Sequence, residues 1–185
     1  MSIDTQDLSQ KTGSPRGKSL PFVDYIISRC QADNGLRAAL KRADNPATEY
    51  QSWEMLASFH VNLEYENQRL SHAAIAAAIA RAKVEKNGTV RIGQAVACCY
   101  EDGNASDQAK ARLRRLLACD SVPEACRILR PLFSLIEAKG NIVPDYASLL
   151  DDLLWFSHDD SRTRIKARWA QDFYGKPAEE GGKDE

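Results

Sequence analysis

The sequence predicts an all-α protein, folded as a compact multi-helix bundle or as two small helical lobes, with disordered polar ends. Apolar residues recur at three- and four-residue spacing through most of the chain. Helix start and stop signals separate these amphipathic segments from one another. No segment alternates apolar and polar residues for long enough to indicate a strand. These observations favour helix packed on helix throughout.

The chain divides by composition into three parts. Its 185 residues are enough for one domain with a substantial core. We expect an all-helical domain over residues 20–174. Residues 1–19 are polar and include glycine and proline, and they are typical of a disordered lead-in. Residues 175–185 have a similar composition and are expected to form a disordered acidic tail.

The N-terminal half contains five apolar stripes of helical period. Asp33-Asn34-Gly35 ends the first, and Pro46 stops the second, because a residue before proline is disfavoured in helix. The fourth is alanine-rich, which gives it high helix propensity, and Asn87-Gly88 is expected to end it. The five predicted helices span 22–30, 36–43, 50–60, 70–86 and 92–99.

Stronger capping signals occur in the C-terminal half. Ser121-Val122-Pro123-Glu124 has capping-box spacing with a proline in the first turn, and Gly140 ends the helix that it opens. Ser106 and Ser161 are expected to cap two further helices, and Pro144-Asp145 opens another. The predicted helices span 106–117, 121–140, 144–154 and 161–173.

Total charge does not mark this as a basic protein. Lysine and arginine number 25 against 26 acids, which gives a net charge of -1 and a pI of about 6.3. This balance argues against a protein that coats nucleic acid through general positive charge. It permits local basic faces, so the arrangement of the cations decides the question.

Several predicted helices place cations beside an apolar stripe. An arginine binds phosphate oxygens through two parallel hydrogen bonds, so converging arginines would favour nucleic-acid binding. The candidate nucleic-acid-binding residues are Arg37, Lys41, Arg42, Arg91, Lys110, Arg112, Arg114, Arg115, Arg127, Arg130, Arg164 and Arg168.

The same pattern has a simpler interpretation. Surface arginines often bury their stems along an apolar stripe while the charged head stays solvated. Nearby acids could also neutralise them: Asp159, Asp160 and Asp172 on the last helix, and Glu124 beside Arg127. The charges alone therefore support only a weak binding hypothesis.

Catalytic motifs are not found. His60, His72 and His158 stand apart, without the spacing of metal ligands, and no phosphate-binding loop or nucleophile elbow occurs. Asp151 and Asp152 are adjacent on a helix, so their side chains diverge by about 100° and do not form a carboxylate pair. We therefore expect no catalytic residue, no metal and no cofactor.

Aromatic and sulfur-containing residues are interpreted as structural. Trp53, Trp155 and Trp169 lie on or beside apolar stripes, so we expect core residues first and stacking platforms second. The odd number of cysteines, without ligand spacing, indicates reduced thiols. No secretory signal or membrane-spanning run is present, which predicts a cytoplasmic location without membrane contact. The five cysteines are Cys30, Cys98, Cys99, Cys119 and Cys126.

Four segments, in order, resemble the CasB-type small subunit of the type I-E CRISPR surveillance complex, Cascade. The resemblance covers about residues 33–174, and Arg168-Trp169-Ala170-x-Asp172-Phe173-Tyr174 is its most distinctive part. One departure occurs after Gly93, where the family often has arginine and this chain has Gln94. The four segments are Asp33-Asn34-Gly35 with Ala38 to Arg42, Ile92 to Ala97, Arg112 to Ala118 with Leu129 to Leu132, and Asp145 to Trp155 with Arg168 to Tyr174.

This resemblance implies a role that composition does not reveal. Such subunits are all-helical, non-enzymatic and cytoplasmic, and two copies lie head to tail against the backbone and large subunits of Cascade. They help to hold the hybrid of guide RNA and target DNA, together with the displaced non-target strand, through basic residues. The matching basic positions here are Lys41, Arg42, Arg112, Arg114, Arg115 and Arg130.

Three other functions stand as alternatives. An all-helical adaptor that binds only protein partners is the main one, with its arginines serving subunit contacts or solubility. A helix-turn-helix transcription factor is less favoured, because no short helix combines Asn, Gln and Arg at base-reading spacing. An enzyme is favoured least.

Overall fold

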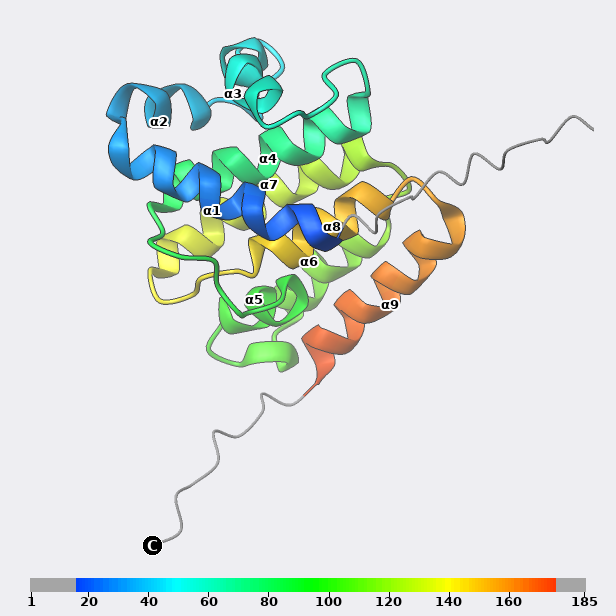
Figure 1. Ribbon diagram of the computed structural model, residues 1–185. Coiled ribbons are helices and arrows are strands. Elements are labelled where there is room, and N and C mark those ends of the chain that lie inside the picture. The colour runs from blue at the N-terminus through cyan, green and yellow to red at the C-terminus, as the bar shows by residue number, and fades with distance from the viewer. Residues whose placement is uncertain (1–15, 176–185) are drawn as a thin grey trace, which may run out of the picture.

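The computed structural model describes residues 16–175, so most of the two predicted polar ends, 1–15 and 176–185, lies outside the described residues. The fold is all-α, which confirms the predicted class (Figure 1). Its α-helices are α1 (Arg16–Ala32), α2 (Asn34–Leu40), α3 (Trp53–Ser58), α4 (Glu66–Ala82), α5 (Ile92–Cys98), α6 (Asp107–Leu117), α7 (Val122–Lys139), α8 (Tyr146–Trp155) and α9 (Asp159–Tyr174). Two 3₁₀ turns, η1 (Glu49–Ser52) and η2 (Gly103–Ala105), precede α3 and α6.

Helix α4 is at the centre of the bundle. Every residue from Ala73 to Ala80 is buried, and a helix that is apolar on all sides belongs in the interior of a protein. Its alanines have small side chains, so α1, α2, α7 and α8 all pack against it. The interior position of α4 follows directly from its composition.

A second group of helices is built on α5 and α9. Helix α9 runs from its turn with α8 along the side of the molecule to α5 (Figure 1), and α6 packs against α5, α7 and α9. Gly93 of α5 makes this contact close, because a Cβ there would lie 2.1 Å from the carbonyl oxygen of Trp169. One cluster of buried apolar side chains runs through both groups.

Capping signals in the C-terminal half have the expected effects. Ser106 Oγ accepts a hydrogen bond from the Ala109 amide, and Ser121 Oγ accepts one from the Glu124 amide, both at 3.3 Å. The Glu124 carboxylate accepts a hydrogen bond from the amide of Asp120, one residue before the Ser121 amide that a capping box would use. Gly140 ends α7 with a φ of 74°. These starts and this stop confirm the sequence prediction.

Some predicted boundaries were wrong. Helix α1 begins at Arg16, so it includes 16–19, which were expected to be disordered, and Ser19 is buried against α8, where its Oγ donates to Asp151 Oδ1 at 2.6 Å. Helix α4 ends before Lys83, whose left-handed backbone stops it four residues earlier than Asn87. Helix α9 begins at Asp159, ahead of the predicted cap Ser161.

No described helix is long and apolar enough to cross a membrane. Across residues 16–175, no group of three or more His, Cys, Asp and Glu side chains is placed to hold a metal ion.

Candidate nucleic-acid interface

The candidate cations fall into three groups on the folded chain. The α6 face comprises Lys110, Arg112, Arg114 and Arg115. The Asp44 junction comprises Arg127 and Arg130 of α7, which line a groove with Asp44, together with Lys41 and Arg42, three and two positions before Asp44 in the chain. The α8–α9 groove contains Arg164 and Arg168, with Arg91 beside it. Arg37 stands one helical turn before Lys41 and is half-buried.

The α6 face offers unpaired positive charge on one helix. Helix α6 buries Ala109, Leu113 and Leu116, and this leaves Arg114 and Arg115 exposed on its solvent side. Neither arginine forms an ion pair within residues 16–175. Their guanidinium groups can therefore take an anionic partner without giving up an internal one.

The other two cations of this face are held by short-range contacts. Arg112 Nε donates a hydrogen bond to the Tyr100 hydroxyl at 2.8 Å, which fixes the side chain while its terminal nitrogens remain for a ligand. Lys110 Nζ donates to the Ala105 carbonyl oxygen at 2.9 Å and lies 3.8 Å from the exposed Asp107 carboxylate. Lys110 thus contributes less free charge than the three arginines.

The Asp44 junction brings cations from distant parts of the sequence together. Arg81 binds both carboxylate oxygens of Asp44, and Arg130 Nε lies 3.6 Å from the same carboxylate. Arg81 also donates to the Lys41 carbonyl oxygen at 3.0 Å, so the end of α2 is fixed against α4. Because one buried carboxylate faces two guanidinium groups, the half-exposed Arg130 keeps part of its charge for solvent or a ligand.

A groove of about 880 Å³ borders this junction. Its floor is largely apolar, and its rim carries charges of both signs, including Arg127, Arg130 and Glu124. Arg127 lies 4.0 Å from Glu124, one helical turn away, as considered from the sequence. The mixed rim makes the groove itself a poor site for phosphates and a better one for a protein surface.

In the α8–α9 groove Arg168 and Arg164 differ in their exposure and in their partners. Arg168 Nη2 donates to Asp152 Oδ1, and Trp169 Nε1 donates to Asp152 Oδ2 at 2.7 Å. Burial raises the pKa of the Asp152 carboxyl, while Arg168 beside it acts in the opposite direction. Arg168 thus fixes α9 to α8, whereas Arg164 is exposed and, among residues 16–175, donates to the Asp160 carbonyl oxygen at 3.2 Å.

Arg91 lies near the buried Asp152 carboxylate and the half-buried Asp172 carboxylate. Its positive charge opposes the raised pKa of both Asp152 and Asp172. The side chain is exposed at the N-terminal end of α5 and forms no ion pair with a described residue. Arg91 therefore lies with the α8–α9 groove and apart from the α6 face.

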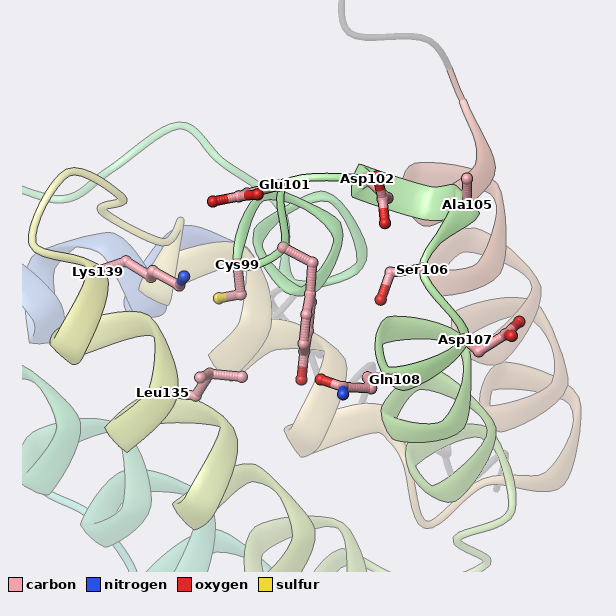
Figure 2. A pocket seen from close by; sticks show the side chains of 10 residues that line it. Cys99, Glu101, Asp102, Ala105, Ser106, Asp107, Gln108, Leu135 and Lys139 are labelled. Atoms are coloured by element: carbon pink, nitrogen blue, oxygen red, sulfur yellow. The ribbon is translucent and has the colours of Figure 1, made fainter.

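An open cavity of about 630 Å³ lies between α5, α6 and the end of α7 (Figure 2). Glu101 and Asp102 lie at its upper edge, Lys139 of α7 flanks one side, and Asp107 points away from it. Carboxylates outnumber the single ammonium group there. This cavity is not suited to the phosphates of a nucleic acid.

Sequence reasoning missed two residues that shape these surfaces, Tyr100 and Asp44. Tyr100 holds Arg112, and Asp44 gathers Arg81 and Arg130. Trp53 and Trp155 are 41% and 39% exposed, so the core positions that were expected first are wrong for both, and the second expectation, a stacking platform, stays a prediction. No local pattern could have indicated the two polar residues, because their partners lie 12 to 86 positions away.

Comparisons with known proteins give a consistent result. The family model described as CRISPR-associated protein Cse2 matches residues 36–174. The chain is 36% identical over 166 residues to the CRISPR-associated protein Cse2 of Thermus thermophilus, covering 86% of this chain and 91% of that protein. Its fold is similar to the crystal structure of CasB from Thermobifida fusca, with a TM-score of 0.64 and 16% identity, over 84% of this chain and 97% of that one.

Proposed function

The chain belongs to the CRISPR-associated Cse2 family, and we propose that it serves as the non-catalytic small subunit of a type I-E CRISPR Cascade complex in antiviral defence. In this role it contacts the hybrid of guide RNA and target DNA and the displaced non-target strand, and it stabilises the R-loop. Its protein partners are the backbone and large subunits and a second copy of itself, head to tail.

One observation carries the strand-holding part of this proposal. Arg112, Arg114 and Arg115 stand on a single rigid helix without an ion-pair partner in the described part of the chain. Other candidate cations, such as Arg168 and Arg130, face internal carboxylates. The α6 face therefore offers a phosphate backbone three uncompensated arginines on one helix.

The energetics suit an R-loop. Exchanging a DNA duplex for an RNA–DNA hybrid is nearly balanced, so modest contacts to the strands can shift the equilibrium. Lysine and arginine contacts to phosphates release counterions, which gives sequence-independent affinity with a steep dependence on salt. The near-neutral total charge limits binding of the free subunit to unrelated DNA.

The test compares two double variants in the assembled complex. Arg114→Gln/Arg115→Gln removes two charges from the α6 face, and Arg29→Gln/Lys86→Gln removes two exposed charges from α1 and from the segment after α4. Target-DNA affinity is measured across a salt series. The α6 variant should bind more weakly, and its salt slope should fall by about 0.7 to 0.9 for each phosphate that is no longer neutralised.

The control variant should keep the affinity and slope of the unchanged complex. Equal effects from both variants would indicate a nonspecific charge effect. No effect from the α6 variant would remove the strand-holding claim.

A second function has its own support. The apolar groove beside the Asp44 junction, with Tyr50 and Trp53 exposed nearby on η1 and α3, has the character of a protein-binding surface. An adaptor that binds only protein partners would use this surface and leave the α6 face solvated. Nuclease-insensitive assembly, together with no crosslink between this chain and DNA, would favour the adaptor.

A further inference from the structure

We propose that the α8–α9 groove holds one unpaired nucleotide of a single strand, with its base stacked on Trp155 and its phosphate on Arg164. This inference rests on the proposed function, because it requires that the chain meets nucleic acid. It adds a site of a different kind, since the α6 face offers charge, while this groove offers an aromatic surface together with charge.

The groove is formed where α8 turns into α9. Asp151 and Trp155, four residues apart, share one face of α8, and Ser161, Arg164 and Ile165 line the opposite wall from α9. Its volume is about 320 Å³, at the small end of the range for ligand sites. A site of this size fits a single planar ligand better than an extended chain segment.

The Trp155 ring is not needed to fill the core. Trp169 and Phe156 stack on each other in the interior, so the core here is already filled. The His158 ring lies 5.2 Å from the Trp155 ring, centroid to centroid, and supports it within the turn. A supported indole that still lines a groove is a suitable surface for a base, because every base presents a π-face.

Arg164 provides the positive charge. Arg168 is neutralised by Asp152, and Asp151 accepts a hydrogen bond from Ser19 on the α1 side. The Arg164 guanidinium forms no ion pair with a described residue, and its hydrogen bond to the Asp160 carbonyl oxygen uses only Nε. Its two terminal nitrogens are thus available for phosphate oxygens beside the stacked base.

The experiment uses the full chain and a short single-stranded DNA that contains 5-iododeoxyuridine. After irradiation, the crosslinked tryptic peptides are identified by mass spectrometry; peptide 140–162 carries Trp155. The expected crosslink is at Trp155. Trp155→Ala should lose it and weaken single-strand affinity about fivefold or more, whereas Trp155→Phe keeps most of the affinity because stacking is retained.

Matched variants make the result specific. Trp53→Ala removes a tryptophan of similar exposure, 41%, from α3 and should change neither crosslink nor affinity. Arg164→Gln should weaken binding without altering the fold, which covers the case in which Trp155→Ala is unstable. A crosslink at 140–162 that survives in Trp155→Ala would overturn the proposal.

The outcomes also separate this inference from the proposed function. If Arg114→Gln/Arg115→Gln weakens binding while the Trp155 and Arg164 variants do not, the α6 face stands and the groove proposal fails. If none of these variants alters binding, both proposals fail. If Trp155→Ala instead reduces co-purification with the other Cascade subunits and leaves DNA crosslinking unchanged, the groove is a protein contact and the nucleotide site is rejected.

Discussion

Arg81 of α4 binds both oxygens of the Asp44 carboxylate, with Nη2 at 2.8 Å from Oδ2 and Nη1 at 3.1 Å from Oδ1. The carboxylate is nearly buried, with 6% of its side chain exposed. This contact joins the segment after α2 to the central helix and places it beside Arg130 of α7. The arrangement of the Asp44 junction therefore depends on one ion pair.

Asp44→Ala should destabilise the protein strongly, because it leaves the largely buried Arg81 charge without a carboxylate partner. We expect the free energy of unfolding to fall by about 3 kcal/mol, measured by urea denaturation. Arg130→Gln is the control: its half-exposed contact with Asp44 is longer, so the destabilisation should be below about 1 kcal/mol. Similar destabilisation of the two variants would contradict this assignment.

Gly93→Ala should separate α5 from α9. The new Cβ would lie 2.1 Å from the Trp169 carbonyl oxygen and 2.9 Å from the Phe173 amide nitrogen, and backbone atoms cannot rotate away. The free energy of unfolding should fall by about 3 kcal/mol or more. Gly35→Ala in α2 meets only the flexible Asp33 carboxylate at 3.2 Å and should change stability by less than about 1 kcal/mol.

Arg168→Gln should produce a stability loss that depends on pH. Burial holds the pKa of the Asp152 carboxyl above its usual value, and removing Arg168 should raise it further, with Arg91 as the remaining nearby cation. Because the folded state then binds a proton more readily than the unfolded chain, lowering the pH favours folding. At pH 7.5 the free energy of unfolding should fall by about 2 kcal/mol, less than for a fully buried ion pair because the Arg168 side chain is 35% exposed. This loss should shrink as the pH falls through the raised pKa of Asp152.

Arg164→Gln is the matched control for that pH series. It removes an exposed cation from the same helix, four residues earlier, without touching a carboxylate. Its free energy of unfolding should stay within about 0.5 kcal/mol of the unchanged protein, without a trend between pH 5 and 8. A constant deficit for Arg168→Gln over that range would show that Asp152 does not carry the effect.

Helix positions could be predicted because their causes are local. Ser106, Ser121 and Gly140 act on backbone groups within four residues, so their caps are visible in the sequence. The end of α4 could not be placed in the same way. Lys83 adopts a left-handed backbone without being glycine or asparagine, and Asn87 instead caps the start of α8 by accepting the Tyr146 amide at 2.9 Å.

The candidate site was predicted less completely because charge pairing is a long-range property. The local acid Asp159 pairs with Arg162, three residues later on the same helix. The partners of Arg168 and Arg130, however, are Asp152 and Asp44, which lie 16 and 86 positions away. Sequence spacing alone could not separate these compensated arginines from the free ones on the α6 face.

Thiol labelling should distinguish Cys98 from the other four cysteines. Burial raises the pKa of Cys119 to about 11 and that of Cys126 to about 12, and it also raises those of Cys30 and Cys99. Thiolate is the reactive form, so these four should react slowly at pH 8 in the folded protein. In the folded protein one thiol per chain should react rapidly, and Cys98→Ser should abolish this fast phase. All five thiols should react after unfolding. Several fast phases in the folded protein would contradict this burial.

Tyr100→Phe tests whether Arg112 is held ready for a phosphate. The change removes the hydroxyl that accepts from Arg112 Nε at 2.8 Å, so the side chain must be ordered again on binding, at about 1 kcal/mol. Single-strand affinity, measured by fluorescence anisotropy, should fall about fivefold, and Arg112→Gln should cost more. In the Arg112→Gln background Tyr100→Phe should have no further effect, because Tyr100 acts only through Arg112. A Tyr100 effect that persists in that background would show that the phenol contacts the strand itself.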